Sequence, residues 1–166
     1  MFKKLFGKKE EPVKNVKMLS PITGNAVSLD QVPDPVFSEK MMGDGIAIEP
    51  SEGVVVSPVD GEILQVFPTK HAVGIKAKNG AEILIHIGLE TVSLKGEGFE
   101  THVKQGDTVS AGDKLVTFDL NVIGEKAKST ITPVIITNTD QAASLEKLAE
   151  GRVEAGKTPL LEVIFD

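Results

Sequence analysis

Short runs of β-branched and aliphatic residues, each followed by a turn, constrain the fold of this chain more than any other feature of its sequence. Each run has the length and composition of a strand. Seven of them lie at residues 54–56, 62–67, 72–77, 81–87, 114–118, 130–137 and 160–165. Strands so closely spaced leave little room for crossover helices, which predicts an all-β, single-domain antiparallel β-sandwich or barrel-like fold.

Turn and helix signals agree with this fold class. Pairs that favour positive φ stand around the runs, at Asp44-Gly45, Asp60-Gly61, Asn79-Gly80, Gly106-Asp107 and Gly112-Asp113. Helical patterning is scarce and predicts one to three short helices. One is expected over 140–148 with Asp140 as N-cap, and another over 121–127 after Asp119.

The first residues differ from the rest of the chain. Residues 1–16 are predicted to be a flexible basic tail, and residues 17–166 to form the β domain. An alternative for residues 1–10 is a weak membrane contact, in which Phe2, Leu5 and Phe6 face anionic lipid. No apolar stretch follows the basic start, so we expect no signal peptide.

Composition excludes several classes of function. The net charge is −6 and the chain has no Trp or Tyr, so we expect no nucleic-acid partner. It also has no Cys, which removes disulfides, thiolate zinc sites and cysteine nucleophiles. No run of about 18 apolar residues is present. We therefore expect a cytoplasmic protein.

Histidine placement gives the first indication of a site. If Asn79-Gly80 forms a two-residue turn, cross-strand partners have numbers that sum to 159. This register puts His86 opposite Val73, and Gly88 opposite His71. The two imidazoles would then be diagonal neighbours on one face, about 7–8 Å apart at Cα.

The same register predicts which residues surround the pair. Val73, Ile75 and Leu84 would lie beside the imidazoles, and Ile83, Ile85 and Ile87 on the opposite face. The histidines would thus stand on an otherwise apolar surface.

The chemistry of such a pair remains open from spacing alone. It could be structural, or it could bind a metal with His102 as a third ligand. It could also serve phosphoryl transfer, with one ring as nucleophile, the other stabilising the phosphate and Thr69 supplying a hydroxyl.

Six motifs favour the last alternative. They occur in the same order as in the glucose-type enzyme IIA family of the bacterial phosphoenolpyruvate-dependent sugar phosphotransferase system, which the chain resembles from about residue 20 onward. The resemblance implies the family's duplicated hybrid-motif fold. The motifs span residues 32–37, 42–48, 68–72, 84–92, 94–99 and 127–133.

The resemblance also implies a specific reaction. His86 resembles the residue that accepts a phosphoryl group, through Nε2, from the phosphohistidine of the carrier HPr. The group then passes to a cysteine of a IIB or IIBC sugar permease. His71 resembles the second histidine, which stabilises the phosphate, and Thr69 the threonine that hydrogen-bonds in the same site. No cofactor is implied.

A partner-binding surface is implied as well. Gly88 is expected to leave room for the backbone of a partner. The family also has regulatory protein targets, and in some relatives the two histidines share a zinc ion with such a target, which His71 and His86 could do here. The surface is expected to comprise Asp34, Val36, Phe37, Ile46, Phe67, Leu84, Gly88 and Glu90.

Two rival functions belong to related sandwich folds. A zinc hydrolase would use an H-x-H pair on one strand, but the strand here has only His86. A lipoyl or biotinyl carrier would need a modified lysine, and Lys40 superficially resembles one. Lys40 lies far from the tandem Gly-Asp turns, however, and in the wrong order.

Overall fold

The computed structural model describes residues 14–165. The predicted basic tail lies largely outside these residues, and the first strand begins at Asn15. No helix within the described range is long and apolar enough to cross a membrane.

Strands form most of the regular structure, and every strand pairing is antiparallel. The described strands are β1 (Asn15–Leu19), β2 (Gly24–Val27), β3 (Asp44–Pro50), β4 (Val54–Val56), β5 (Gly61–Val66), β6 (Ala72–Ala77), β7 (Glu82–His86), β8 (Phe99–Thr101), β9 (Thr108–Val109), β10 (Lys114–Phe118), β11 (Thr132–Ile136), β12 (Ser144–Lys147), β13 (Gly151–Val153) and β14 (Pro159–Ile164). The described helices are α1 (Pro35–Ser38), α2 (Leu120–Lys126) and the 3-10 turns η1 (Leu29–Gln31), η2 (Thr91–Leu94) and η3 (Thr139–Gln141).

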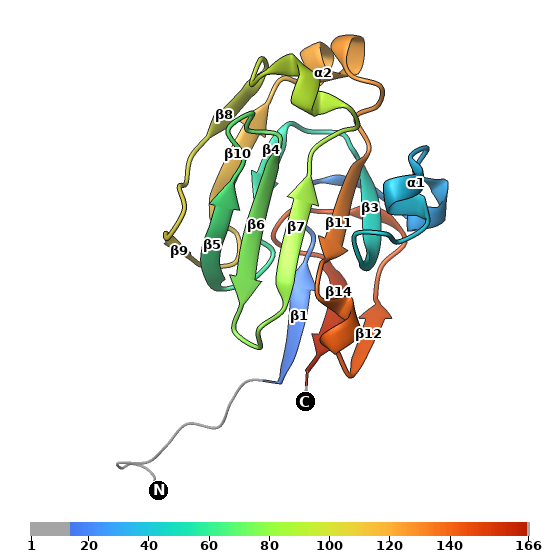
Figure 1. Ribbon diagram of the computed structural model, residues 1–166, viewed down its shortest axis with the longest axis vertical. Coiled ribbons are helices and arrows are strands. Elements are labelled where there is room, and N and C mark those ends of the chain that lie inside the picture. Colours follow the sequence, from blue (N-terminus) through green and yellow to red (C-terminus); the bar gives the residue numbers. More distant parts are fainter. Residues whose placement is uncertain (1–13, 166) are drawn as a thin grey trace, which may run out of the picture.

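One large sheet forms the framework of the molecule. Its strand order is β13-β2-β3-β11-β7-β6-β5-β9, and two three-stranded sheets, β1-β14-β12 and β4-β10-β8, accompany it. Figure 1 shows β5, β6, β7 and β11 side by side across the front of the molecule. The inner face of the large sheet carries alternating apolar residues that join the main core with Met18, Leu115 and Leu161 of the smaller sheets. The predicted all-β antiparallel sandwich is confirmed.

The order of the large sheet is symmetric about its centre. The connection before β2 and the one before β5 match in detail: Ser20 Oγ donates to Ile22 O and Ser57 Oγ to Val59 O. The two connections also bind each other reciprocally. Leu19 N–H donates to Pro58 O at 3.0 Å, and Val56 N–H to Pro21 O at 2.8 Å. The fold is therefore an internal duplication.

The duplicated halves meet between β7 and β11. Ile85 pairs with Val134 across this boundary. On either side, Ile85 pairs with Val73 of β6, and Val134 with Ile46 of β3. Consequently β3 corresponds to β6, and β11 to β7.

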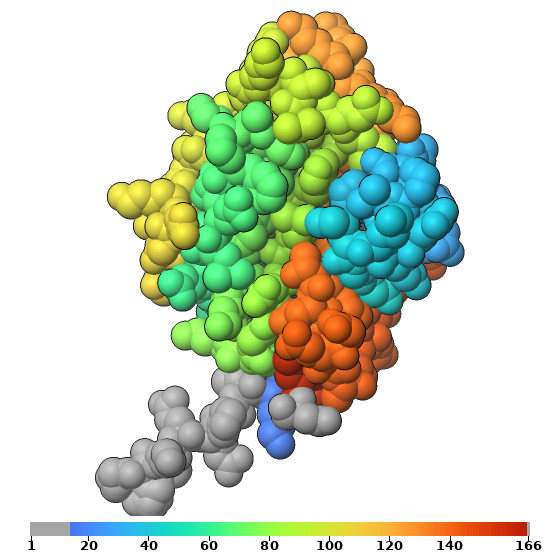
Figure 2. Space-filling view, in the orientation of Figure 1, coloured from blue at the N-terminus to red at the C-terminus, as the bar shows by residue number. Residues whose placement is uncertain are grey.

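The two halves differ on the outer face of the sheet. Between β2 and β3 the chain makes a long excursion over residues 28–43, which contains η1 and α1. Leu29, Val32 and Phe37 of this excursion pack on Ala47 and Ile135 in a second apolar cluster. The corresponding connection between β5 and β6 is only a short turn, so that half keeps no such cover. Figure 2 shows the excursion, in blue to cyan, projecting beside the flatter green surface of β5 and β6.

Several predicted elements agree with the structure. The runs at 54–56, 72–77 and 114–118 coincide with β4, β6 and β10, and the other four lie within two residues of β5, β7, β11 and β14. The helix expected after Asp119 is α2, and Asp119 caps it by accepting from Asn121 N–H and Val122 N–H.

Other expectations are wrong. Residues 140–148 form η3 and the strand β12 in place of a helix, because 144–147 pair with β14 at the edge of a sheet. Asp44-Gly45 and Asp60-Gly61 begin or precede strands rather than forming turns with positive φ. Helix α1 was not predicted, although Asp34 as N-cap and Pro35 at the first position are its signal.

A substitution at Gly45 tests how closely β3 and β11 pack in the half of the fold that residues 28–43 cover. A Cβ at this position would lie 1.9 Å from Val134 O of the neighbouring strand, so Gly45→Ala must displace β3 from β11. We expect it to lower the free energy of unfolding by about 1–3 kcal/mol, the range for overpacked sites.

Gly124→Ala is the matched control. Its Cβ would make an ordinary contact of 3.8 Å with Thr130 Cγ2, and it lies in α2. It should raise the free energy of unfolding by up to about 1 kcal/mol. Urea unfolding of the two variants measures both effects, and equal values would contradict the close approach at Gly45.

Candidate functional site

The turn between β6 and β7 sets the register of the hairpin that carries His86. Ala77 O accepts from Gly80 N–H at 3.0 Å, and Ala77 N–H donates to Ala81 O at 2.9 Å. The loop therefore has three residues, and Gly80 takes φ +95° at its end. His86 pairs with Ala72, so the predicted register is wrong by one residue.

This shift changes the surroundings of the histidines. Val73 and Ile75 face the main core together with Ile83 and Ile85, and do not lie beside the imidazoles. Leu84 stays on the outer face with His86, as expected, because the two are separated by one residue along β7.

His71 reaches His86 by a different route from the one predicted. It lies just before β6, in the turn after β5, where Lys70 has φ +64°. Its own carbonyl accepts from Ile87 N–H at 2.7 Å. The two imidazole rings are 4.8 Å apart between centroids and nearly perpendicular, at 79°. They form one pair, with His71 only 4% exposed and His86 half-buried.

Hydrogen bonds orient both rings. His86 Nδ1 lies 2.8 Å from Gly88 O. A carbonyl can only accept, so Nδ1 carries the proton and Nε2 holds the free lone pair. His71 Nδ1 lies 2.6 Å from Thr69 Oγ1. The hydroxyl can donate to that nitrogen, which leaves His71 Nε2 as an N–H donor.

The environment keeps both imidazoles neutral near pH 7. Burial, and secondarily the neighbouring His86, lower the pKa of His71 from 6.5 to about 4. Burial also lowers the pKa of His86, although the Gly88 carbonyl and the Asp34 carboxylate oppose the shift. The pair thus presents one nucleophilic nitrogen beside a second neutral ring.

Two phenylalanines enclose the pair. The Phe37 ring lies 5.1 Å from that of His86 between centroids, and the Phe67 ring 5.5 Å from that of His71. Phe37 comes from α1 in the first half of the chain, and Phe67 from the turn after β5. The site is therefore built by both halves of the duplication.

Gly88 has a different structural role from the one expected. It is buried with φ +74°, and a Cβ on it would lie 2.7 Å from Thr91 Cγ2 and 2.9 Å from Ser129 O. Its lack of a side chain accommodates the protein's own η2 and the loop before β11 rather than a partner. Ile87, not Gly88, is hydrogen-bonded to His71. The carbonyl that orients His86 is a contribution that sequence reasoning missed.

The remaining surface residues are only partly brought together. Asp34 and Val36 lie at α1, with Val36 39% exposed, and exposed Glu90 immediately precedes η2 with φ +60°. Leu84 is buried in the second apolar cluster. Ile46 lies in the main core, on the opposite face of β3, and Ala47 takes the outer face in its place.

Three of the exposed apolar residues that the sequence analysis missed lie in the segments around α1 and η2. Met41 and Met42 follow α1, and Val92 lies in η2. They extend the apolar surface along the two segments that contain Asp34 and Glu90. Exposure was their only signal, and it required the structure.

Other candidates lie away from the pair. His102 Nε2 hydrogen-bonds Thr117 Oγ1 between β8 and β10. Lys40, the residue considered for a carrier lysine, forms an ion pair with Asp44. Within the part of the chain that the structure describes, no group of three or more His, Cys, Asp or Glu side chains could hold a metal ion.

Comparisons with known proteins agree on one family. The family model described as phosphoenolpyruvate-dependent sugar phosphotransferase system, EIIA 1, matches residues 16–142. The chain is similar to the PTS system glucose-specific EIIA component of Bacillus cereus, at 59% identity over 163 residues and 98% of each chain. It is similar to the component of the same name from Staphylococcus aureus, at 55% identity over 166 residues and 100% of each chain.

A solved structure adds a match in three dimensions. Glucose permease IIA from Mycoplasma capricolum superposes with a TM-score of 0.84 and is 46% identical in sequence. The match covers 92% of this chain and 99% of that one.

The neutral state of His71 predicts how stability depends on pH. The unfolded chain protonates this imidazole near pH 6.5, but the folded chain does so only near pH 4. Between these values the unfolded state binds more protons, so stability falls as the pH falls. The loss attributable to His71 should reach about 3 kcal/mol at pH 4.

His71→Gln, which cannot titrate, isolates this contribution. Its free energy of unfolding, compared with that of the wild type by urea unfolding at pH 7 and pH 4, should gain about 3 kcal/mol relative to the wild type on acidification. His102→Gln, a replacement at an exposed position, provides the reference. An unchanged difference between wild type and His71→Gln would mean that His71 is not held neutral by burial.

Proposed function

This chain belongs to the phosphoenolpyruvate-dependent sugar phosphotransferase system EIIA 1 family, and from this premise we propose that it carries a phosphoryl group on His86. The donor is the phosphohistidine of HPr, and the acceptor is a cysteine of a IIB sugar permease domain. The observation that carries the proposal is the hydrogen bond from His86 Nδ1 to Gly88 O, which leaves Nε2 free to attack.

Acceptance exchanges one phosphorus–nitrogen bond for another. His86 Nε2 attacks phosphorus as the donor's phosphorus–nitrogen bond breaks, and the donor imidazole leaves with its electron pair. The low pKa of His86 keeps Nε2 unprotonated at neutral pH. The phosphoryl group arrives already activated, so the chain contributes geometry, electrostatics and exclusion of water.

His71 and Thr69 stabilise the transferred group. With Thr69 Oγ1 donating to His71 Nδ1, the proton of His71 lies on Nε2 and can be donated to a phosphoryl oxygen. The short ring-to-ring distance brings this donor beside His86. Because its orientation is fixed before the encounter, it needs no rearrangement during transfer.

Donation uses the same hydrogen bond to Gly88. The carbonyl keeps a proton on Nδ1 of the phosphorylated ring, which gives that ring positive character. The cysteine thiolate of the acceptor attacks phosphorus, the bond to Nε2 breaks, and a neutral imidazole leaves. Asp34 favours the positive form of the ring, since its carboxylate opposes the lowering of the His86 pKa by burial.

The surface around the pair suits two successive partners. Exposed Val36, Met41 and Val92 supply apolar contacts, and Asp34 and Glu90 supply acidic groups at the edge for a basic partner. Short-lived docking of this kind needs only a small interface. The proposal places the reaction in the cytoplasm, and the names of the relatives favour glucose as the sugar.

Intact mass spectrometry after incubation with phosphoenolpyruvate, enzyme I and HPr tests the proposal. The wild type should gain one acid-labile phosphate, and His86→Ala none, because it lacks the nucleophile. A folded wild type without added phosphate would contradict the proposal.

The second histidine should affect the two steps unequally. His71→Gln should still accept phosphate but donate it to a IIB domain on the order of 10²-fold more slowly, the usual cost of losing one such donor. Single-turnover rates of both steps measure this, and equal loss in both would contradict the division of roles between His71 and His86.

A further inference from the structure

The helix that carries Phe37, which contacts His86, is too short to be stable by itself. Helix α1 has only four residues, far below the length at which a helix is stable alone. Yet Phe37 is 5% exposed and contacts the His86 ring. Packing in the second apolar cluster holds the ring, and the attachments at the two ends of the helix set how the backbone presents it to that cluster.

The attachment before α1 consists of its N-cap and a lysine from a distant segment. Asp34 accepts from Val36 N–H at 3.0 Å and caps the helix, and Lys128 Nζ donates to Pro33 O at 2.8 Å. These contacts fix where the helix begins. After Ser38, backbone hydrogen bonds from Lys40 N–H to Phe37 O and from Met41 N–H to Val36 O continue the helix into a turn, but they do not join that turn to the sheets.

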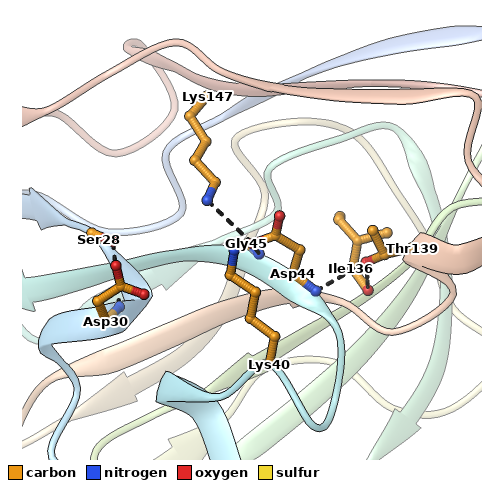
Figure 3. A network of polar contacts seen from close by, with 8 residues as sticks. All are labelled: Ser28, Asp30, Lys40, Asp44, Gly45, Ile136, Thr139 and Lys147. Carbon is orange, nitrogen blue, oxygen red and sulfur yellow. Dashed lines mark hydrogen bonds and ion pairs between the residues drawn. The ribbon is translucent and has the colours of Figure 1, made fainter.

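The attachment after α1 centres on Asp44. The chain turns back through Lys40, with φ +59°, and Gly43, with φ +130°, before β3 begins. Lys40 Nζ lies 3.6 Å from Asp44 Oδ1, and Lys147 Nζ of β12 lies 3.2 Å from the same oxygen. Figure 3 shows both lysines directed at this carboxylate.

Backbone contacts hold Asp44 itself in place. Its Oδ1 accepts from Gly45 N–H at 2.7 Å, and its own N–H donates to Thr139 Oγ1 at 3.0 Å. Thr139 in turn donates to Ile136 O, at the end of β11 (Figure 3). Asp44 thus joins the turn after α1 to three other elements: β3, η3 and β12.

The charge of Asp44 persists across the neutral range. Burial alone would raise its pKa, but the Gly45 N–H and the two lysines outweigh burial and lower it. The carboxylate is 26% exposed, so water weakens its ion pairs only in part.

We propose that Asp44 is a positioning residue for phosphoryl transfer, because it fastens the turn after α1 to β12 and thereby holds Phe37 against the His86 ring. The inference rests on the proposed function, but its structural half does not depend on it. Asp44 touches neither histidine, and it acts only through Lys40 and α1.

Asp44→Asn tests this inference, because the amide keeps the acceptor for Gly45 N–H and removes both ion pairs. With Phe37 held less closely, His86 becomes more exposed, and an NMR titration of its ring should show its pKa moved toward 6.5. Asp34 and His71, the groups that face His86, are unchanged in the variant. We expect kcat/KM for phospho-HPr to fall by about tenfold, since a small misplacement near the reacting atom is costly.

Asp60→Asn is the matched control. Asp60 also accepts a backbone hydrogen bond, from Ala111 N–H at 2.8 Å. It lies far from the histidine pair, because it lines a hollow together with Lys78, which follows β6, whereas His71 precedes β6. It should leave the His86 titration and the transfer rate unchanged.

Lys40→Met tests the route of the effect. It should reproduce part of the change in the His86 titration, and the double variant with Asp44→Asn should be no worse than Asp44→Asn alone. If Asp44→Asn does not fold, Lys40→Met decides by the same two measurements.

The outcomes separate the two proposals. A folded variant with wild-type titration of His86 and wild-type transfer overturns the positioning role, and so does lower stability without a change in either measurement. If the wild type is not phosphorylated at all, the proposed function falls. The titration of His86 in Asp44→Asn and Lys40→Met then still decides whether Asp44 positions Phe37.

Discussion

The pairing of β7 with β11 is the contact on which the rest of the structure depends. It joins the two halves of the duplication at Ile85 and Val134. On the inner face, it brings fully buried side chains of both strands into the main core, where each isoleucine contributes roughly 1.5–3 kcal/mol. On the outer face, the same alternation points Leu84 and His86 away from that core. The packing that stabilises the sheet therefore also places the imidazole, and a slip of one residue would exchange the two faces.

Within this framework, a hydrogen bond and burial together set the protonation state of His86. The Gly88 carbonyl decides which nitrogen carries the proton, and burial keeps the other one unprotonated. Neither the hydrogen bond nor burial places a charge on the His86 ring. The negative charge nearby comes from Asp34, which also caps α1, so the element that encloses His86 and the group that adjusts its pKa belong to one segment. The apolar enclosure and the electrostatics of the site are thus coupled.

Sequence reasoning identified the fold class and the residues of the pair, but not the geometry that joins them. The motifs around His71, His86 and Thr69 were specific enough to name a family, and the turn and strand patterns predicted a sandwich. The register was missed because Gly80 takes positive φ in a two-residue and in a three-residue turn alike, so Asn79-Gly80 does not distinguish them. Ile46 was expected on the surface only from the resemblance, and the alternation of β3 puts Ile46 in the main core and Ala47 on the outer face. The approach of His71 depends on the left-handed Lys70, and strand β12 depends on pairing with distant β14; neither leaves a local signal.

The duplication gives the excursion over residues 28–43 a meaning beyond its own packing. By the pairing of the strands, Asp44 before Gly45 of β3 corresponds to His71 before Ala72 of β6. In the first half, the residue at this position fastens a cover that the chain supplies itself. In the second half, the same position holds His71, one ring of the imidazole pair, and residues 14–165 supply no such cover there. A protein that docks over β6 and β7 would cover the outer face of the second half, as residues 28–43 cover that of the first half. The duplicated fold therefore has one half whose outer face is covered by its own chain. The other half leaves its outer face open to another molecule, next to the histidine pair.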